Sequence, residues 1–447
     1  MNTQKLSRSE ILTIGFMLFA LFLGAGNMIF PPFLGQEAGT NVWTSIAGFL
    51  ITGVGLPLLG VIAIAKSGGD LQVLASRVHP LFGLIFTLII YLAIGPFFGM
   101  PRTGTVAFEI GATPFLSEKT ISSGFALFFF TVLFFALTVW LSMNPSKLVN
   151  RIGKFLTPAI LIILSLLVVK SIVSPMGNPQ NPSTTYLREP LIKGFIEGYL
   201  TMDTIGALVF GIVVINSIQA KGVHSRTMIT KICVTAGIIA AIGLTLVYLS
   251  LAYIGASGVE AIGVQENGGA ILSSVAHHLF GSMGAVILGI VITLACLTTS
   301  VGLVSASAQF FNKILPNVSY PIFVIVLSSF SMIVANIGLT QLISVSIPIL
   351  IMIYPLAIVL ILLSFIHNGF NGYRSVYLGA LIPTFFISLI DGLKAAGLNV
   401  TIFAETLSGL PLFDQGVGWF VPAIIGAVVG YGIAISLGEV RKPVIHE

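Results

Sequence analysis

Long apolar segments separated by short polar loops run along the whole chain and predict twelve membrane-spanning helices. Each segment has about 20 or more mainly apolar residues, the length that a helix needs to cross a bilayer. The predicted spans cover residues 10–35, 43–65, 81–110, 122–142, 149–173, 191–220, 227–255, 283–311, 319–337, 341–366, 375–394 and 417–437. We therefore expect an all-α integral membrane protein with a single transmembrane domain over residues 1–447.

The first predicted span is interrupted at its centre by the stretch Gly24–Asn27, and Pro31 and Pro32 follow one turn later. Glycine is about 1 kcal/mol less favourable than alanine inside a helix, so we expect the helix to open here. Backbone opened at bilayer depth needs protein, water or a bound solute as a partner. The carbonyls that end the first half would face a cation, and the amides of Ala25 and Gly26 would face an anion. A helix that is merely kinked is the alternative.

The sixth predicted span contains Thr201, Asp203 and Gly206 near its centre. A carboxylate at bilayer depth costs at least about 2.5 kcal/mol and usually has a function. Asp203 would ligate a cation, hold a substrate amine or carry a proton; a hydrogen-bonded carboxyl that braces a kink is the structural alternative. Interrupted segments in corresponding positions predict an inverted repeat with a binding site between its halves. We expect one repeat over about 10–173, the second over about 191–366, and two further helices over about 375–437.

The third and eighth predicted spans contribute other polar side chains. Arg102 either lines the outward pathway or extends its charged end to the outer surface. Tyr91 is predicted to offer its hydroxyl to a carboxylate in the pocket. Thr298 and Thr299 place consecutive hydroxyls in the membrane, and a hard cation such as sodium prefers oxygen ligands. Their alternative role is packing and hydrogen bonding between helices.

The composition excludes several classes of protein. With 56% hydrophobic and 8% charged residues, the chain is not a soluble enzyme. The net charge of +5 comes from basic residues in short loops, so no nucleic acid is needed to explain it. No P-loop is present, no buried histidine is expected to act as a base, and no span repeats a polar face as a channel would.

The basic residues also predict the orientation, because cytoplasmic loops carry the excess of lysine and arginine. An even number of spans puts both termini on the same side. Fourteen basic residues fall on that side against five on the other, which predicts cytoplasmic termini. The fourteen are Lys5, Arg8, Lys66, Arg77, Lys147, Arg151, Lys154, Lys221, Arg226, Lys231, Lys313, Arg374, Arg441 and Lys442.

Three motifs together carry a family resemblance: LGAGNMIFPP in the first span, GPFFGMPRTGT in the third and EGYLTMDT in the sixth. In these motifs the chain resembles the bacterial branched-chain amino acid:cation symporters, the BrnQ-type carriers, and the resemblance extends over essentially its whole length. It implies a fold of the leucine-transporter (LeuT) type, with five plus five helices in inverted repeat, two extra helices, and helices 1 and 6 broken at mid-membrane. Substrate would bind between the first, third, sixth and eighth spans.

The resemblance also implies roles for individual residues. A nest of amides at Ala25 and Gly26 would bind the substrate carboxylate. Asn27 and Thr201 stand where some members have a second sodium site, but Asp203 replaces a neutral position there and puts that site in doubt. The segments ALFLGAGN and ACLTTS match the sodium-symporter pattern. The more widely shared sodium site would use the carbonyls of Ala20, Leu23 and Ala295 with the hydroxyls of Thr298 and Thr299.

The sequence therefore predicts a secondary transporter, not an enzyme, in a bacterial plasma membrane. It would import L-leucine, L-isoleucine and L-valine with Na⁺ as the coupling ion and no organic cofactor. The predicted substrate-binding residues are Ala25, Gly26, Asn27, Thr201, Asp203, Tyr91 and Arg102. Proton coupling through Asp203 and transport of another amino acid remain the alternatives. The expected partners are the small substrate and the lipid bilayer; the sequence does not fix the oligomeric state.

Overall fold

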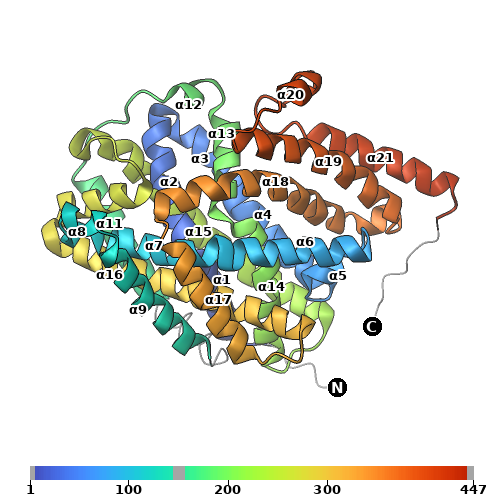
Figure 1. The fold of residues 1–447 in the computed structure, drawn as a ribbon, viewed down its shortest axis with the longest axis horizontal. Helices are drawn as coiled ribbons and strands as arrows, with labels where there is room; N and C mark the ends of the chain where they lie inside the picture. Colours follow the sequence, from blue (N-terminus) through green and yellow to red (C-terminus); the bar gives the residue numbers. More distant parts are fainter. Residues whose placement is uncertain (1–5, 144–156, 440–447) are drawn as a thin grey trace.

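A computed structural model of the chain describes residues 6–143 and 157–439, and every regular element in these ranges is a helix. Figure 1 shows them as a layered bundle, with the last helices extending to one side. The elements before residue 143 are α1 (Arg8–Phe22), α2 (Ala25–Ala38), η1 (Gly39–Asn41), α3 (Val42–Leu50), η2 (Ile51–Gly55), α4 (Leu56–Ser67), α5 (Leu71–Ala75), α6 (Pro80–Leu92), η3 (Ala93–Phe97), α7 (Gly99–Gly111), η4 (Thr113–Phe115), α8 (Glu118–Ser122) and α9 (Phe125–Ser142).

The second described range continues the same all-helical pattern. Its elements are α11 (Thr157–Val173), α12 (Thr184–Arg188), α13 (Pro190–Glu197), η6 (Gly198–Thr201), α14 (Asp203–Gln219), α15 (Arg226–Ile262), α16 (Gly268–Ile314), α17 (Tyr320–Ala335), α18 (Leu339–Phe365), η7 (His367–Phe370), α19 (Arg374–Ala395), α20 (Thr401–Leu407) and α21 (Phe420–Ser436). The predicted fifth span begins at residue 149, outside the described residues, and α11 covers its second part.

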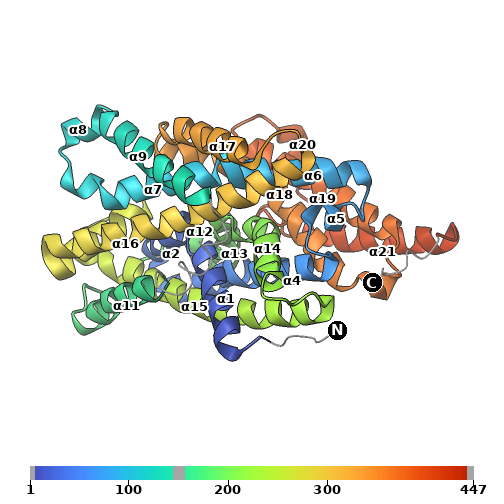
Figure 2. The same cartoon turned by 90° about the horizontal axis from the view of Figure 1, so that it is seen from below.

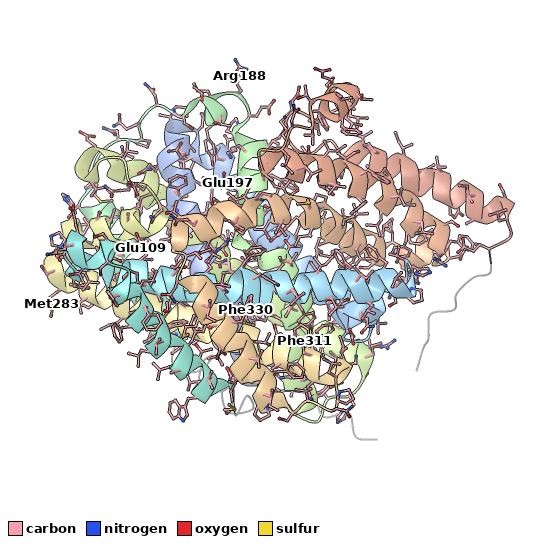
Figure 3. All side chains as sticks on the ribbon, in the orientation of Figure 1. Glu109, Arg188, Glu197, Met283, Phe311 and Phe330 are labelled. Atoms are coloured by element: carbon pink, nitrogen blue, oxygen red, sulfur yellow. The ribbon has the colours of Figure 1, made fainter. Side chains whose placement is uncertain are left out.

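The described helices have the length and composition of membrane spans. Seven stretches are long and apolar enough to cross a bilayer, and an eighth is added if Pro190–Thr201 and Asp203–Gln219 form one bent span. Three shorter apolar helices lie at Pro158–Val173, Tyr320–Ala335 and Phe420–Ser436. Large apolar side chains on the outside, such as Met283 (70% exposed), project away from the bundle (Figure 3). The chain is thus a multi-span membrane protein, while the count of twelve remains a prediction.

Two boundaries in the second half differ from the sequence-based ones. The predicted spans 227–255 and 283–311 leave residues 256–281 as a loop between them. In the structure α15 continues to Ile262, and α16 already begins at Gly268. The backbone of α16 is non-helical at Gly281 (φ 64°, ψ −160°), which separates a short first segment from the long apolar one. Hydropathy indicates only the part of a helix that lies in the bilayer. The helix itself can continue beyond that part, as α15 and α16 do here.

The centre of the bundle is formed by the two interrupted helices. α15 packs along α1 and α2, α16 packs against α7 and α2, and α14 packs against α4. Figure 2 shows α1, α2 and α14 close together in the middle of the molecule, with α15 and α16 alongside. Almost every residue of α2 and of the first half of α14 is buried, so polar groups at their ends face protein or an internal space, not lipid.

Glycines allow α13, the first half of the sixth predicted span, to lie unusually close to α3 in the second predicted span. A side chain on Gly48 of α3 would place its Cβ 1.9 Å from the carbonyl oxygen of Leu191. A Cβ on Gly194 of α13 would lie 1.8 Å from the carbonyl oxygen of Ser45. Close approach through small residues is the usual means of helix association in membranes. This close packing holds α13 in place and so determines where η6, which directly follows α13, ends.

Candidate functional site

The first site element is the break between α1 and α2. α1 ends at Phe22, where the N–H of Leu23 donates to the carbonyl of Phe19 at 2.7 Å. The N–H of Gly24 would continue the helix by donating to Ala20. It donates instead to the carbonyl of Phe22 at 2.6 Å and to Oδ1 of Asn27 at 3.2 Å. The Ala20 carbonyl is therefore released from the helical pattern at the end of α1.

The released carbonyls meet α16 at Thr299. Its Oγ1 lies 3.5 Å from the carbonyl oxygen of Ala20 and 3.4 Å from that of Leu21. A single hydroxyl hydrogen cannot serve two acceptors well, and both distances are long for O–H···O bonds. In the same turn of α16, the hydroxyl of Thr298 donates to the carbonyl of Ala295 at 2.8 Å. These oxygens are of the type that a hard monovalent cation requires.

The predicted cation ligands are only partly brought together by described contacts. The Thr299 hydroxyl reaches the Ala20 carbonyl as expected, but its second carbonyl neighbour is Leu21. Leu23 is fully buried at the break, and no contact between its carbonyl and the two threonines is described; its role stays a prediction. A Cβ on Gly24 would come within 2.8 Å of Thr299 Cγ2, so glycine is needed for this approach.

The second site element is the break in the sixth predicted span. α13 and η6 end at Thr201, Met202 takes a left-handed conformation (φ 66°), and α14 begins at Asp203 with a bend of 41° between the two helices. A non-glycine residue in this region costs about 1–3 kcal/mol unless its surroundings hold it there. Asp203 occupies the first turn of α14, where the helix dipole favours a negative charge. Its N–H donates to Oγ1 of Thr201 at 3.2 Å.

A buried polar network joins the two breaks. Nδ2 of Asn27 donates to Oδ2 of Asp203 at 2.5 Å, and the hydroxyl of Tyr248 donates to the same oxygen at 3.0 Å. Asn27 Nδ2 also contacts the Tyr248 hydroxyl. Two neutral donors on one oxygen stabilise an ionised carboxylate. Sequence reasoning missed Tyr248; the available signal was a tyrosine in the apolar segment 227–255.

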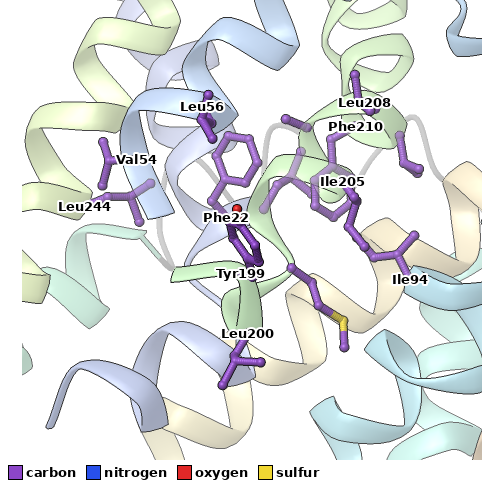
Figure 4. Close-up of a cluster of buried hydrophobic side chains, with 14 of the residues drawn as sticks. Phe22, Val54, Leu56, Ile94, Tyr199, Leu200, Ile205, Leu208, Phe210 and Leu244 are labelled. Carbon is purple, nitrogen blue, oxygen red and sulfur yellow. The ribbon is translucent and has the colours of Figure 1, made fainter. Parts of the chain in front are cut away.

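The two breaks open onto one cavity of about 40 Å³. Its polar lining is Asn27, Arg102, Thr103, Thr201, Asp203 and Thr299; its apolar side chains are Leu21, Phe22, Ile94, Met202, Phe210 and Leu303; and Gly24, Ala25, Gly26, Gly99 and Gly206 supply backbone. Three of these lining residues, Phe22, Ile94 and Phe210, belong to the cluster of buried hydrophobic side chains in Figure 4. Because the first-turn amides of α2 lack intrahelical partners, Ala25 and Gly26 present N–H groups at the cavity. The cavity thus combines backbone N–H groups at a helix start, an internal carboxylate and an apolar part.

Arg102 lies inside this site and does not reach the outer surface. Its side chain is 2% exposed, Nη1 donates to the carbonyl of Leu200 at 2.5 Å, and Nη2 donates to Oγ of Ser346 at 2.9 Å. The guanidinium also stands 5.4 Å from the ring centre of Phe30. The alternative in which Arg102 extends to the surface is wrong, because α7 is covered at this level by η6 and α18. Nε of Arg102 has no hydrogen-bond partner in the described structure.

Tyr91 does not lie where the sequence-based prediction requires. Its ring stacks on Phe310 at 3.9 Å between ring centres, and it is not among the residues that line the cavity. Ile94, three residues further along, lies in the cavity wall. The helix widens into a π-helix over Ala93–Phe97, with a non-helical backbone at Gly95. Tyr91 therefore lies about one turn before the position that faces the cavity. The hydroxyl that contacts the carboxylate is that of Tyr248.

Comparison with known sequences assigns the chain to a family. Residues 7–436 match the family described as branched-chain amino acid transport protein. The branched-chain amino acid permease BrnQ of Bacillus subtilis (strain 168) is 52% identical over 435 residues, covering 97% of this chain and 98% of the relative. The branched-chain amino acid transport system 2 carrier protein of Pseudomonas aeruginosa is 46% identical over 435 residues, with the same coverage of both chains.

Comparison with solved structures concerns the fold alone. Mhp1, a nucleobase-cation-symport-1 family transporter in a closed conformation with bromovinylhydantoin bound, superposes with a TM-score of 0.61 at 14% identity. That match covers 98% of this chain and 94% of the other. MhsT in complex with L-phenylalanine gives a TM-score of 0.56 at 16% identity, covering 98% and 99%. Both are transporters of the LeuT fold. The chain therefore belongs to the branched-chain amino acid transport protein family and is a membrane transporter, not an enzyme, built on the LeuT-type fold.

Proposed function

We propose that this protein imports L-leucine, L-isoleucine and L-valine by sodium symport. The observation that carries the proposal is the cavity between the two helix breaks, which places the amides of Ala25 and Gly26, the carboxylate of Asp203 and an apolar wall around one space. A zwitterionic amino acid with a hydrocarbon side chain is the solute that needs all three. The names of the relatives at 52% and 46% identity support the choice of branched-chain substrates.

The substrate carboxylate would bind the amides of Ala25 and Gly26, because helix N-termini bind anions through free N–H groups and the helix dipole. Its ammonium group would bind the carboxylate of Asp203, which Asn27 and Tyr248 hold in position. The branched side chain would occupy the part of the cavity lined by Ile94 and neighbouring apolar groups. Arg102 would act as a positioning residue, since it holds the end of η6 through the Leu200 carbonyl.

Sodium, as the co-transported cation, would bind between the end of α1 and α16. The Ala20 carbonyl oxygen and the hydroxyl oxygen of Thr299 lie 3.5 Å apart there. This distance is long for a hydrogen bond, but it suits two oxygens that bind the same cation. The hydroxyl of Thr298 and the carbonyls of Ala295 and Leu23 would complete the set. Because only two residues lie between the end of α1 and the start of α2, a cation at this point would also order the amides that receive the substrate.

Alternating access would move one group of helices against the other around this site. The proposed repeats are residues 10–173 and 191–366, whose breaks meet at Gly26 and Thr201: a Cβ on Gly26 would lie 3.0 Å from Thr201 Cα. Both termini would be cytoplasmic, because most basic loop residues lie on their side.

The proposal is tested by leucine uptake into proteoliposomes. An inward sodium gradient should drive uptake, competition by isoleucine and valine should reduce it, and a proton gradient without sodium should not drive it. Liposomes without protein, and proteoliposomes in which a sodium ionophore has dissipated the gradient, are the controls. Absence of leucine uptake under either gradient would overturn the choice of substrate.

Proton coupling through Asp203 is the second candidate. It is favoured by the buried network in which Asn27 and Tyr248 both donate to Oδ2 of Asp203, since ionisable groups inside the membrane often form proton relays. Uptake that follows only the proton gradient would select this mechanism and leave Thr298 and Thr299 as packing residues.

A further inference from the structure

A second hollow lies on the outside of the bundle, away from the central cavity. Its space of about 430 Å³ is bounded by one face of α6 from Phe82 to Ile89, one face of α19 from Leu378 to Phe386, and Leu356 of α18. The contributing positions recur every three or four residues on both helices, so each presents a continuous stripe. Apart from His79 at one end, all its lining residues are apolar.

This groove faces the side of the protein that the bilayer covers. Ile85 of α6 and Ile382 and Phe386 of α19 are 48%, 52% and 59% exposed, and all three belong to predicted spans. From His79 to Ile89 the groove runs for about 15 Å along α6, given a rise of about 1.5 Å per residue. Half of a hydrocarbon core of about 30 Å is the depth of one leaflet. The groove therefore has the length of an acyl chain within a single leaflet.

Basic residues gather at the His79 end. Nε of Arg374 donates to the carbonyl of Val78 at 2.6 Å, which places the start of α19 beside the start of α6 (Figures 1 and 2). Arg77 immediately precedes Val78 in the chain. Burial, together with Arg77 and Lys66, lowers the pKa of His367 to about 4, as expected where positive charges are close.

The acidic groups near this end are already engaged. Glu439 accepts hydrogen bonds from the N–H groups of Arg374 and Ser375 at the start of α19. Asp70 pairs with Lys313. Among the described residues at this end, Lys66, Arg77 and Arg374 therefore leave an excess of positive charge beside the opening of the groove.

We propose that the groove binds one acyl chain of an anionic glycerophospholipid from the leaflet on the side of the protein's termini, with its phosphate group beside Arg77 and Arg374. The apolar stripes accept the chain, and the basic end selects the headgroup, because each basic residue near the surface favours anionic lipid. A second protein molecule fits less well, since the groove runs along the helix axes and ends in a cluster of like charges. This site is independent of the proposed transport function.

Native mass spectrometry of the purified protein in mild detergent tests the proposal, with phosphatidylglycerol and phosphatidylcholine of identical acyl chains as probes. One phosphatidylglycerol should bind in preference to phosphatidylcholine. The Arg77→Gln variant should lose about fivefold in phosphatidylglycerol affinity, the factor for one basic residue, and Ile382→Trp should fill the groove and remove the preferred binding. Lys119→Gln and Ile424→Trp, both on other parts of the described surface, should bind as the unaltered protein does.

Three results would overturn the proposal. Equal binding of the two lipids would remove the headgroup site. Unchanged phosphatidylglycerol binding in both Arg77→Gln and Ile382→Trp would place the bound lipid elsewhere. A dimer without bound lipid that dissociates in Ile382→Trp would assign the groove to a second copy of the chain.

Discussion

The side-chain amide of Asn27 donates a hydrogen bond to the carboxylate of Asp203 at 2.5 Å, although 176 positions separate the two residues. Asn27 stands in the first turn of α2 and Asp203 in the first turn of α14, so the bond joins the starts of two helices that follow the breaks. Both helix N-termini thus point towards one place, and their dipoles add at the position where the substrate is proposed to bind.

Replacing Asp203 by Asn separates the two coupling mechanisms. If Asp203 receives the substrate ammonium group, the variant should raise the KM for leucine about ten- to a hundredfold in both driven uptake and exchange, because a charge-assisted hydrogen bond contributes about 1.5–3 kcal/mol. Asp391→Asn, a carboxylate of α19 that does not line the cavity, is the control. An Asp203→Asn protein that exchanges leucine normally but does not accumulate it would point to proton coupling.

Replacing Thr299 by Ala should raise the sodium concentration for half-maximal uptake about fivefold or more, because the cation loses a hydroxyl ligand beside the Ala20 carbonyl. The loss corresponds to about 1 kcal/mol, typical of one net hydrogen-bonding contact. Thr299→Ser keeps the hydroxyl and should keep the sodium dependence. Thr384→Ala removes a buried hydroxyl that donates to the Ala380 carbonyl in α19 and controls for packing. An unchanged sodium requirement in Thr299→Ala would leave this threonine with a packing role.

A methyl group on Gly26 should disturb the contact between the two breaks. Its Cβ would lie 3.0 Å from both the Cα and the carbonyl oxygen of Thr201, and backbone atoms cannot move aside as a flexible side chain can. We expect Gly26→Ala to reduce leucine uptake at least tenfold and to destabilise the protein by about 1–3 kcal/mol, the usual cost of overpacking. Gly432→Ala, where a Cβ meets nothing within 4 Å, is the matched control for uptake and thermal unfolding. Normal uptake by Gly26→Ala would contradict the close approach.

Gly206 and Ile94 face each other in the apolar part of the cavity and limit its size. A Cβ on Gly206 would lie 3.0 Å from Cδ1 of Ile94, so Gly206→Ala should shrink the space for the substrate side chain. Because one methylene in an apolar pocket changes affinity by about tenfold or more, leucine should lose about tenfold against valine in uptake competition. Adding Ile94→Val removes the opposing methyl group and should restore the preference. If the unaltered protein, Gly206→Ala and the double variant all showed the same ratio of leucine to valine uptake, the substrate side chain would have to bind elsewhere.

Several features of the site could be predicted from the sequence because they depend on local composition. The glycines at 24 and 26 weaken a helix wherever they stand in it, so an opening between Phe22 and Ala25 could be expected before any packing was known. A carboxylate within an apolar segment is energetically unfavourable whatever its neighbours in space, so Asp203 could be singled out from the sequence. The family motifs, read together, gave the fold and the class of protein, and the comparisons agree with both.

Other features depend on which helices lie side by side. Arg102 has the same sequence surroundings whether it reaches the surface or is covered, and η6 and α18 cover it through Leu200 and Ser346. Tyr91 and Tyr248 are both tyrosines in apolar spans; only the packing of α15 against α2 brings the second one to Asp203.

What the sequence determined by itself is thus the membrane location, the helical class, the weak points of the first and sixth spans, and the family. Hydropathy and helix propensity act over one or two turns, and both can be read along the chain. Only the tertiary structure decided which carbonyls face Thr299, which hydroxyl reaches Asp203, and that a groove remains between α6 and α19. Those contacts join residues far apart in the chain, and their energies depend on the exact approach of whole helices.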